Sequence, residues 1–123
     1  MKKFKNSTFS VVSLDKDIGG ISKMIENSSK AMQYEVKKLN IFLLKNTQTC
    51  IHIKKVFEKK SNVFVHEINL IQKSLIKLGI VEKKLHNILK DSNFIFLHNT
   101  SLTKGINKYF DLIPLLLFFH TDK

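Results

Sequence analysis

The chain has no arginine and no tryptophan, and only one cysteine and one proline among its 123 residues. Arginine supplies the planar fork that grips phosphates and reads guanine edges, so its absence argues against sequence-specific recognition of nucleic acid. The single cysteine, Cys50, excludes an intrachain disulfide, and we expect it to be a small buried apolar side chain. The longest nearly continuous apolar run, Leu112–Phe119, is far shorter than the roughly 20 residues that a membrane-spanning helix needs.

Local signatures of catalysis are also missing. The sequence has no glycine-rich phosphate loop, because Gly19 and Gly20 are only a pair, and no nucleophile elbow. No two histidines lie three or four residues apart, so no helix would present two imidazoles to one metal ion, and the acidic residues are spread singly. We therefore expect no enzyme activity, no catalytic residues, no metal, no cofactor and no small-molecule substrate.

The charge is strongly positive, and all 21 basic residues are lysines, which gives a formal net charge of +11. Such a balance favours acidic partners. Two lysine doublets lie close together in the sequence and predict a basic patch made of Lys54, Lys55, Lys59 and Lys60. This patch could bind anionic lipid or nucleic acid through charge alone. The alternative is an ordinary solvated surface.

Apolar residues recur every seven residues, with companions at a spacing of four, over most of the middle of the chain. This spacing is typical of long helices, and no glycine or proline interrupts the sequence between Ile21 and Leu78. The pattern predicts an all-α protein built on a long antiparallel helical hairpin or coiled coil. Its apolar stripe is wide enough to predict a homo-oligomer. The expected self-association seam contains Met32, Val36, Leu39, Leu43, Ile53, Phe57, Phe64, Ile68, Ile71, Leu75, Leu78, Leu85 and Leu89.

Three parts of the chain are expected. Residues 1–16 are polar and basic and predict a flexible arm, residues 17–92 the helical hairpin domain, and residues 93–123 a linker with a shorter apolar helix. The polar stretch at 59–62 favours a turn between two helices of similar length. One continuous helix over 21–90 is the alternative, and it would need a partner along its whole length.

The C-terminal segment is apolar on nearly every side if it is helical. We expect a contact surface there, either with another subunit or with a membrane partner, formed by Phe110, Ile113, Leu117, Phe118 and Phe119.

In size and composition the chain resembles the Borrelia haemolysin accessory proteins, which are small phage-associated proteins encoded beside a holin-like membrane protein. The resemblance rests on the short arm MKKFKNSTFSVVSL, on the lysine-, isoleucine- and leucine-rich middle without glycine or proline, and on the lack of an arginine-rich or catalytic motif. It covers most of the chain. It implies a soluble accessory protein that acts by binding rather than by catalysis.

These observations predict a non-enzymatic accessory or scaffold protein that acts through helical protein–protein contacts. The resemblance implies a small membrane-permeabilising protein as its partner. The alternatives are a basic protein that binds nucleic acid by non-specific charge, and a purely structural coiled coil. No signal-peptide core follows the basic N-terminus, so we expect a cytoplasmic protein. A peripheral position at the inner face of the membrane is the alternative location.

Overall fold

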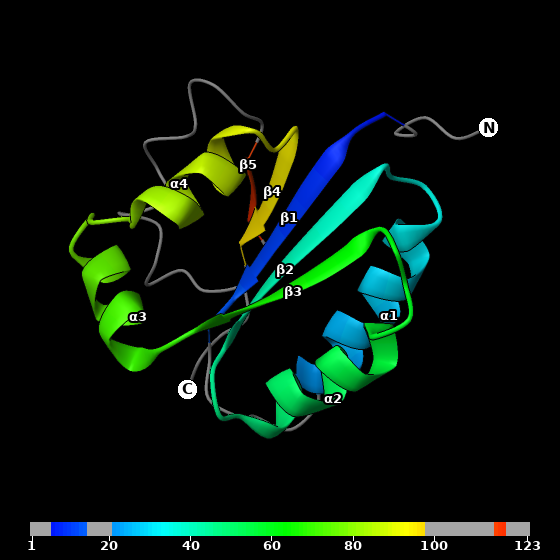
Figure 1. Ribbon diagram of the computed structural model, residues 1–123, viewed down its shortest axis with the longest axis horizontal. Helices are drawn as coiled ribbons and strands as arrows, with labels where there is room; N and C mark the ends of the chain where they lie inside the picture. Colours follow the sequence, from blue (N-terminus) through cyan, green and yellow to red (C-terminus); the bar gives the residue numbers. More distant parts are fainter. Residues whose placement is uncertain (1–5, 15–20, 98–114, 118–123) are drawn as a thin grey trace.

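The centre of the molecule is a parallel β-sheet of five strands (Figure 1). The structure is a computed structural model that describes residues 6–14, 21–97 and 115–117. The strand order is β3-β2-β1-β4-β5, and every neighbouring pair is parallel. The strands are β1 (Thr8–Ser13), β2 (Lys38–Leu44), β3 (Val63–Ile68), β4 (Phe94–Leu97) and β5 (Leu115–Leu117).

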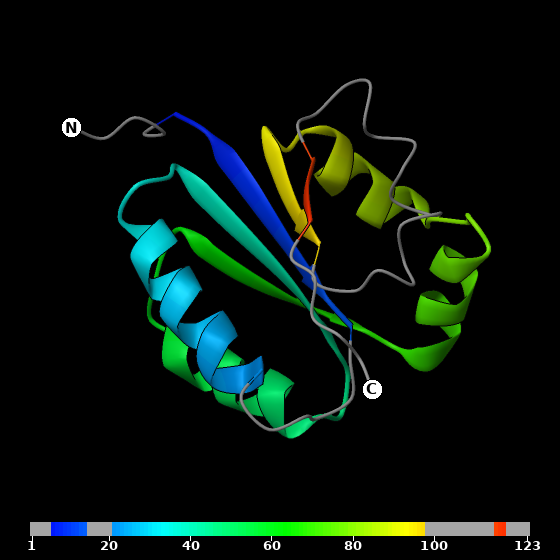
Figure 2. The ribbon, with the colours of Figure 1, turned by 180° about the vertical axis from the view of Figure 1, so that it is seen from behind.

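Helices cover both faces of the sheet. The helices are α1 (Ile21–Gln33), α2 (Gln48–Phe57), α3 (Leu70–Lys77) and α4 (Lys83–Lys90). Helices α1 and α2 lie side by side on one face, and α3 and α4 lie on the other face, as the opposite views in Figures 1 and 2 show. The chain thus forms a three-layer α/β arrangement.

The two central strands β1 and β2 are buried on both faces, which explains their composition. Every residue of β2 after Lys38 is buried, and so is every residue of β1 after Thr8. Parallel strands covered by helices on both sides read as nearly continuous apolar runs rather than as alternating patterns. The β2 sequence KLNIFLL and the β1 sequence TFSVVS fit this rule.

Alternate residues of each strand serve two separate cores. On one face, Val11 and Ile41 pack with Ile25 of α1 and Ile53 of α2. On the other face, the sheet packs against α3 and α4 through a cluster composed of Val12, Leu14, Phe42, Ile68, Ile76, Leu85, Leu89, Ile95 and Leu97. Burial of aliphatic and aromatic side chains on both sides of the sheet is the main favourable term that stabilises the fold.

The all-α prediction is wrong, and so are the coiled coil and the helical bundle. The helix expected before the turn at 59–62 is divided into α1, β2 and α2. The helix expected after that turn is divided into β3, α3 and α4. The turn expected at 59–62 does fall between two elements, α2 and β3, but these are a helix and a strand.

The ends of the chain also differ from expectation where the structure describes them. Residues 8–13, which belong to the expected flexible arm, form the central strand β1. Leu115–Leu117, which belong to the expected C-terminal helix, form β5 beside β4. Among the described helices, none combines the length and the apolar character that crossing a membrane requires.

Candidate functional site

The carboxyl ends of β1 and β4 mark the point where the winding of the sheet changes direction. From β1 the chain proceeds outward through β2 to β3, and it then returns to the other side of β1 to form β4. The two strands are paired directly, with Val12 opposite Leu97. In open parallel sheets the connections leave such a point toward opposite faces, and the crevice that remains outside the strand ends is where ligands bind.

Helix α1 begins at this same edge of the sheet. Six residues separate Leu14, which follows β1, from Ile21, the first residue of α1, and they include the adjacent pair Gly19-Gly20. These six residues lie outside the described part of the chain. The first backbone N–H groups of a helix have no partner within the helix, and the helix dipole places partial positive charge there. The start of α1 is therefore suited to an anionic group.

Helices α2 and α3 each have a backbone N–H of the first turn capped by a side chain of their own chain. The side chain of Thr47 accepts a hydrogen bond from the backbone N–H of Cys50 (3.1 Å). Asn69 and Gln72 form a reciprocal capping box at α3, with both hydrogen bonds at 2.8 Å. These caps and the residues around them line a cavity of about 490 Å³ at the carboxyl ends of β2 and β3.

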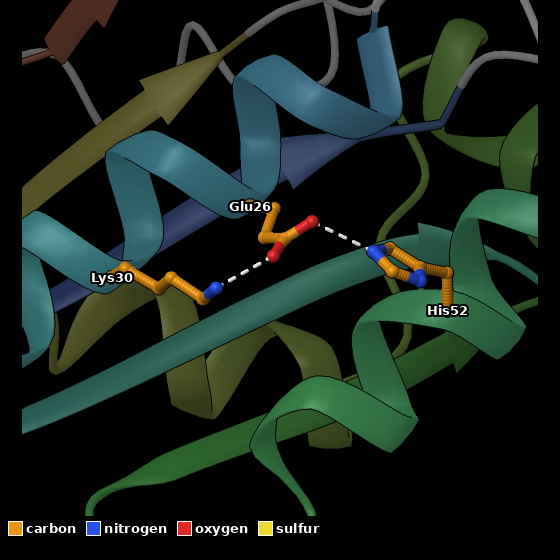
Figure 3. Close-up of polar contacts among 3 residues, drawn as sticks. All are labelled: Glu26, Lys30 and His52. Atoms are coloured by element: carbon orange, nitrogen blue, oxygen red, sulfur yellow. Dashed lines mark hydrogen bonds and ion pairs between the residues drawn. The ribbon is translucent and has the colours of Figure 1, made fainter.

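A group of three polar side chains joins α1 to α2 (Figure 3). Glu26 of α1 is nearly buried, and its two carboxylate oxygens contact Nζ of Lys30 and Nε2 of His52, each at 2.7 Å. Hydrogen bonds from Lys30 and then His52 lower the pKa of Glu26 to about 2, against the opposing effect of burial. Glu26 therefore remains a carboxylate at neutral pH and fixes the orientation of the His52 ring.

A second cavity, of about 330 Å³, lies between β3 and the helices α3 and α4. His66 lines it and stacks on Phe42, with ring centroids 4.7 Å apart. Nε2 of His66 donates to Oδ1 of the buried Asn40 (3.0 Å). Burial lowers the pKa of His66, and the positive charges of Lys84 and Lys38 lower it further. The lowered pKa favours the neutral form of the imidazole at neutral pH.

Most residues of the expected self-association seam lie in the two cores of the sheet. Eight of them are buried: Val36, Leu39, Leu43, Ile53, Phe57, Ile68, Leu85 and Leu89. Met32 and Leu75 are half-buried, and Phe64, Ile71 and Leu78 are exposed. The apolar pattern thus identified core residues, but for a sheet with helices on both faces rather than for contacts between helices. Whether the chain forms a homo-oligomer stays a prediction.

The lysines of the expected basic patch are all exposed. Lys54 contacts Glu67 of β3 (3.0 Å), and this contact raises the pKa of the Lys54 ammonium group. The patch as a binding site for lipid or nucleic acid stays a prediction. Of the expected C-terminal contact residues, Leu117 lies in β5, and Phe110, Ile113, Phe118 and Phe119 lie outside the described residues.

Cys50 is buried, as expected, and burial raises the pKa of its thiol, so it is not an activated nucleophile.

Sequence reasoning missed the pairing of Glu26 with His52, because the two lie 26 positions apart and no local pattern links them. It also did not relate the pair Gly19-Gly20 to the elements on either side of it. Gly19-Gly20 stands between a run of β-forming residues and a helix, and this order is a signal that the sequence carries.

Within residues 6–14, 21–97 and 115–117, no three histidine, cysteine or acidic side chains gather in a way that could hold a metal ion. The carboxyl edge of the sheet is thus the candidate site that follows from the fold.

The family implied by the resemblance stays a prediction. Comparison with known proteins gives no match, because no protein-family model, no curated protein and no solved structure is significantly similar to this chain.

Proposed function

We propose that this protein binds a phosphate-bearing small molecule of the nucleotide class at the carboxyl ends of β1 and β4. The single observation that carries the proposal is the strand order β3-β2-β1-β4-β5, which places the change of winding between β1 and β4. In parallel sheets of this kind, ligand sites lie outside the strand ends at that point.

Two features of the sequence support a phosphate rather than a neutral ligand. Gly19-Gly20 directly precedes α1, and glycine allows a ligand to approach the backbone closely at a helix start. The net charge of +11 raises the local concentration of anions around the molecule. A complete three-glycine fingerprint is not present in the sequence, so the proposal names the class of ligand and no particular dinucleotide.

Chemical-shift mapping by NMR tests the position of the site. The uniformly labelled protein is titrated with ADP, UDP and inorganic pyrophosphate. We expect saturable shifts at the carboxyl edge, at Ser13, Leu14 and Leu97, and none at the amino edge, at Thr8 and Lys38. Shifts confined to the amino edge, or no saturable shift with any of the three ligands, would contradict the proposal.

A matched pair of variants tests the anion. Gly20→Asp adds a negative charge directly before α1, and Ser61→Asp adds the same charge at an exposed position beside the amino end of β3. We expect Gly20→Asp to weaken binding of the best ligand by at least about tenfold, which corresponds to roughly 1.4 kcal/mol. Ser61→Asp should leave the affinity unchanged, and equal effects of the two variants would indicate general charge repulsion instead.

The expected accessory role beside a membrane-permeabilising protein remains a separate proposal. It was based on a helical seam whose residues mostly lie in the cores of the sheet, so protein contacts would need another surface. Non-specific binding to nucleic acid through lysines also remains a separate proposal. Its test is whether the affinity for any DNA or RNA falls steeply as salt rises.

A further inference from the structure

Helix α3 turns apolar side chains toward solvent, which is unusual for a helix that covers a sheet. Leu70 is 61% exposed, Ile71 is 73% exposed and Leu78 is 65% exposed. Ile80, just after the helix, is 53% exposed. We call these four residues the α3 apolar surface. Single exposed apolar residues are common, but four of them on one short segment are typical of an interaction surface.

The geometry of α3 explains why Leu70, Ile71 and Leu78 share one side. Successive helix residues are separated by 100°, so Leu70, Ser74 and Leu78 follow one another along a single face, with Ile71 at its border. Ile76 points the other way and is buried in the core that α3 and α4 form with the sheet. Because Ile76 anchors the inner side of α3, the outward direction of Leu70 and Leu78 is fixed.

The end of α3 is also fixed, which holds Ile80 close to the helix. The backbone N–H of Ile80 donates to the carbonyl of Leu75 (2.8 Å), and that of Gly79 donates to the carbonyl of Ile76 (2.9 Å). Gly79 has a positive φ of 91°. This pair of hydrogen bonds with a left-handed glycine is the Schellman motif, which ends a helix firmly.

Lysines accompany the apolar residues. Lys73 and Lys77 belong to α3, and Lys77 is exposed. Lys45 lines the same cavity as Leu70 and Ile71. Lys83 and Lys84 are exposed at the start of α4.

Glu82, directly before α4, is the acidic residue between Leu70 and Lys84, and its carboxylate accepts a hydrogen bond from the side chain of Gln72. Apolar side chains among lysines match the interface of an anionic membrane, where acyl chains lie beneath negative head groups.

We propose that the α3 apolar surface, with Lys45, Lys73 and Lys77, binds peripherally to a membrane that contains anionic lipid. The apolar side chains insert shallowly between the head groups, and the ammonium groups remain at the level of the phosphates. This surface is separate from the ligand site at β1 and β4, and the proposal does not depend on that site.

A second copy of the chain fits the surface less well. Stable interfaces bury roughly 800 Å² on each partner, and the four side chains of the α3 apolar surface, which are 53% to 73% exposed, present far less area than that. The lysines beside the patch would also repel their counterparts in a symmetric dimer. A membrane requires neither a large complementary area nor an opposing charge on a folded partner.

Vesicle sedimentation tests the proposal with the full chain. We expect the protein to bind vesicles of phosphatidylcholine mixed with phosphatidylglycerol, and not vesicles of phosphatidylcholine alone. The double variant I71S/L78S should lower the partition coefficient on mixed vesicles by at least about tenfold. The variant K73Q/K77Q should lose most of the preference for anionic vesicles.

The matched control is Y34S/I51S, because Tyr34 and Ile51 are exposed apolar residues away from α3, at 65% and 57%. It should partition as the wild type does, and circular dichroism should show that all variants are folded. The proposal is overturned if the wild type ignores mixed vesicles, or if I71S/L78S binds them as well as Y34S/I51S does. It is also overturned if sedimentation without lipid shows a wild-type dimer that I71S/L78S abolishes, since the surface would then bind a second copy.

Discussion

Nε2 of His52 lies 2.7 Å from Oε1 of Glu26, so the second turn of α2 is tied to the second turn of α1. The other carboxylate oxygen of Glu26 is held by Lys30 on the same helix, also at 2.7 Å. One carboxylate thus links the two helices that cover one face of the sheet. Because both helices begin at the carboxyl edge, this link holds the helix starts in a fixed relation there.

The first prediction concerns pH and Glu26. Its pKa is lowered from 4.5 to about 2 in the folded protein, so its contribution to stability is complete above pH 4.5 and is lost as the pH falls through about 2. Glu26→Gln should therefore lower the free energy of unfolding at pH 7, and the difference from the wild type should shrink between pH 4.5 and about 2. Urea unfolding at several pH values measures it. Glu35→Gln, at an exposed carboxylate, is the control, and a similar loss there would contradict the assignment.

The second prediction concerns His66. Burial lowers the pKa of this imidazole, so NMR titration should give a midpoint below the ordinary value of 6.5. The unfolded chain takes up the proton at a higher pH than the folded one, so stability should fall as the pH drops below 6.5 and should level off below the folded pKa. Lys84→Gln removes one of the nearby positive charges and should move the midpoint up. A midpoint at or above 6.5 in the wild type would contradict the described environment.

The heptad pattern misled the prediction of fold class for a physical reason. A spacing of four residues places two side chains on the same face of a helix, but also on the same face of a strand, because four is an even number. Leu39 and Leu43 satisfy both patterns, and they lie in β2. Ile41, between them, distinguishes a strand from a helix, because an apolar residue at every second position is typical of a strand. The sequence therefore identified most of these residues correctly as buried, although Phe64, Ile71 and Leu78 are exposed. It assigned the residues that lie in strands, such as Leu39 and Leu43, to a helix.

The candidate site was hidden for a different reason. Its position depends on which strands are neighbours, and β1 pairs with β4 across more than 80 residues of sequence, as in the pair Phe9 and Phe94. No local pattern encodes such a pairing. The sequence does show the pair Gly19-Gly20 before α1, but only a strand in front of that pair, which the structure shows as β1, connects it with the proposed ligand site.

The third prediction uses two isoleucines of α2 that differ in burial. Ile53 is fully buried in the core between the sheet and the two helices, whereas Ile51 is 57% exposed. Ile53→Ala should lower the free energy of unfolding by about 2–5 kcal/mol, because it removes buried methyl groups and leaves a cavity. Ile51→Ala should change it by less than about 0.5 kcal/mol. Equal effects in denaturant titrations would be inconsistent with the described packing of α2.

The fourth prediction concerns Gly79. Its φ of 91° lies in the left-handed region, and a Cβ placed there would meet no atom within 4 Å, so the cost of a side chain is one of backbone strain and not of collision. Gly79→Ala should destabilise the fold by about 1–2 kcal/mol. Gly79→Asn should cost less, because asparagine tolerates this conformation better. Thermal unfolding of the two variants in parallel measures this order, and a reversed order would contradict the Schellman ending of α3.

The last prediction concerns two adjacent serines of α1. Ser29 is fully buried, and its hydroxyl has no hydrogen-bond partner among the described residues, whereas the hydroxyl of Ser28 donates to the carbonyl of Met24 (2.8 Å). A buried hydroxyl without a partner loses its hydrogen bonds to water on folding and gains none in the protein, which costs stability. Alanine is also the better helix former. Ser29→Ala should therefore raise the free energy of unfolding by about 1 kcal/mol. Ser28→Ala, which removes a satisfied and partly exposed hydroxyl, should change it by less than about 0.5 kcal/mol. Urea unfolding of both variants provides the comparison, and a clear loss of stability in Ser29→Ala would mean that its hydroxyl has a partner after all.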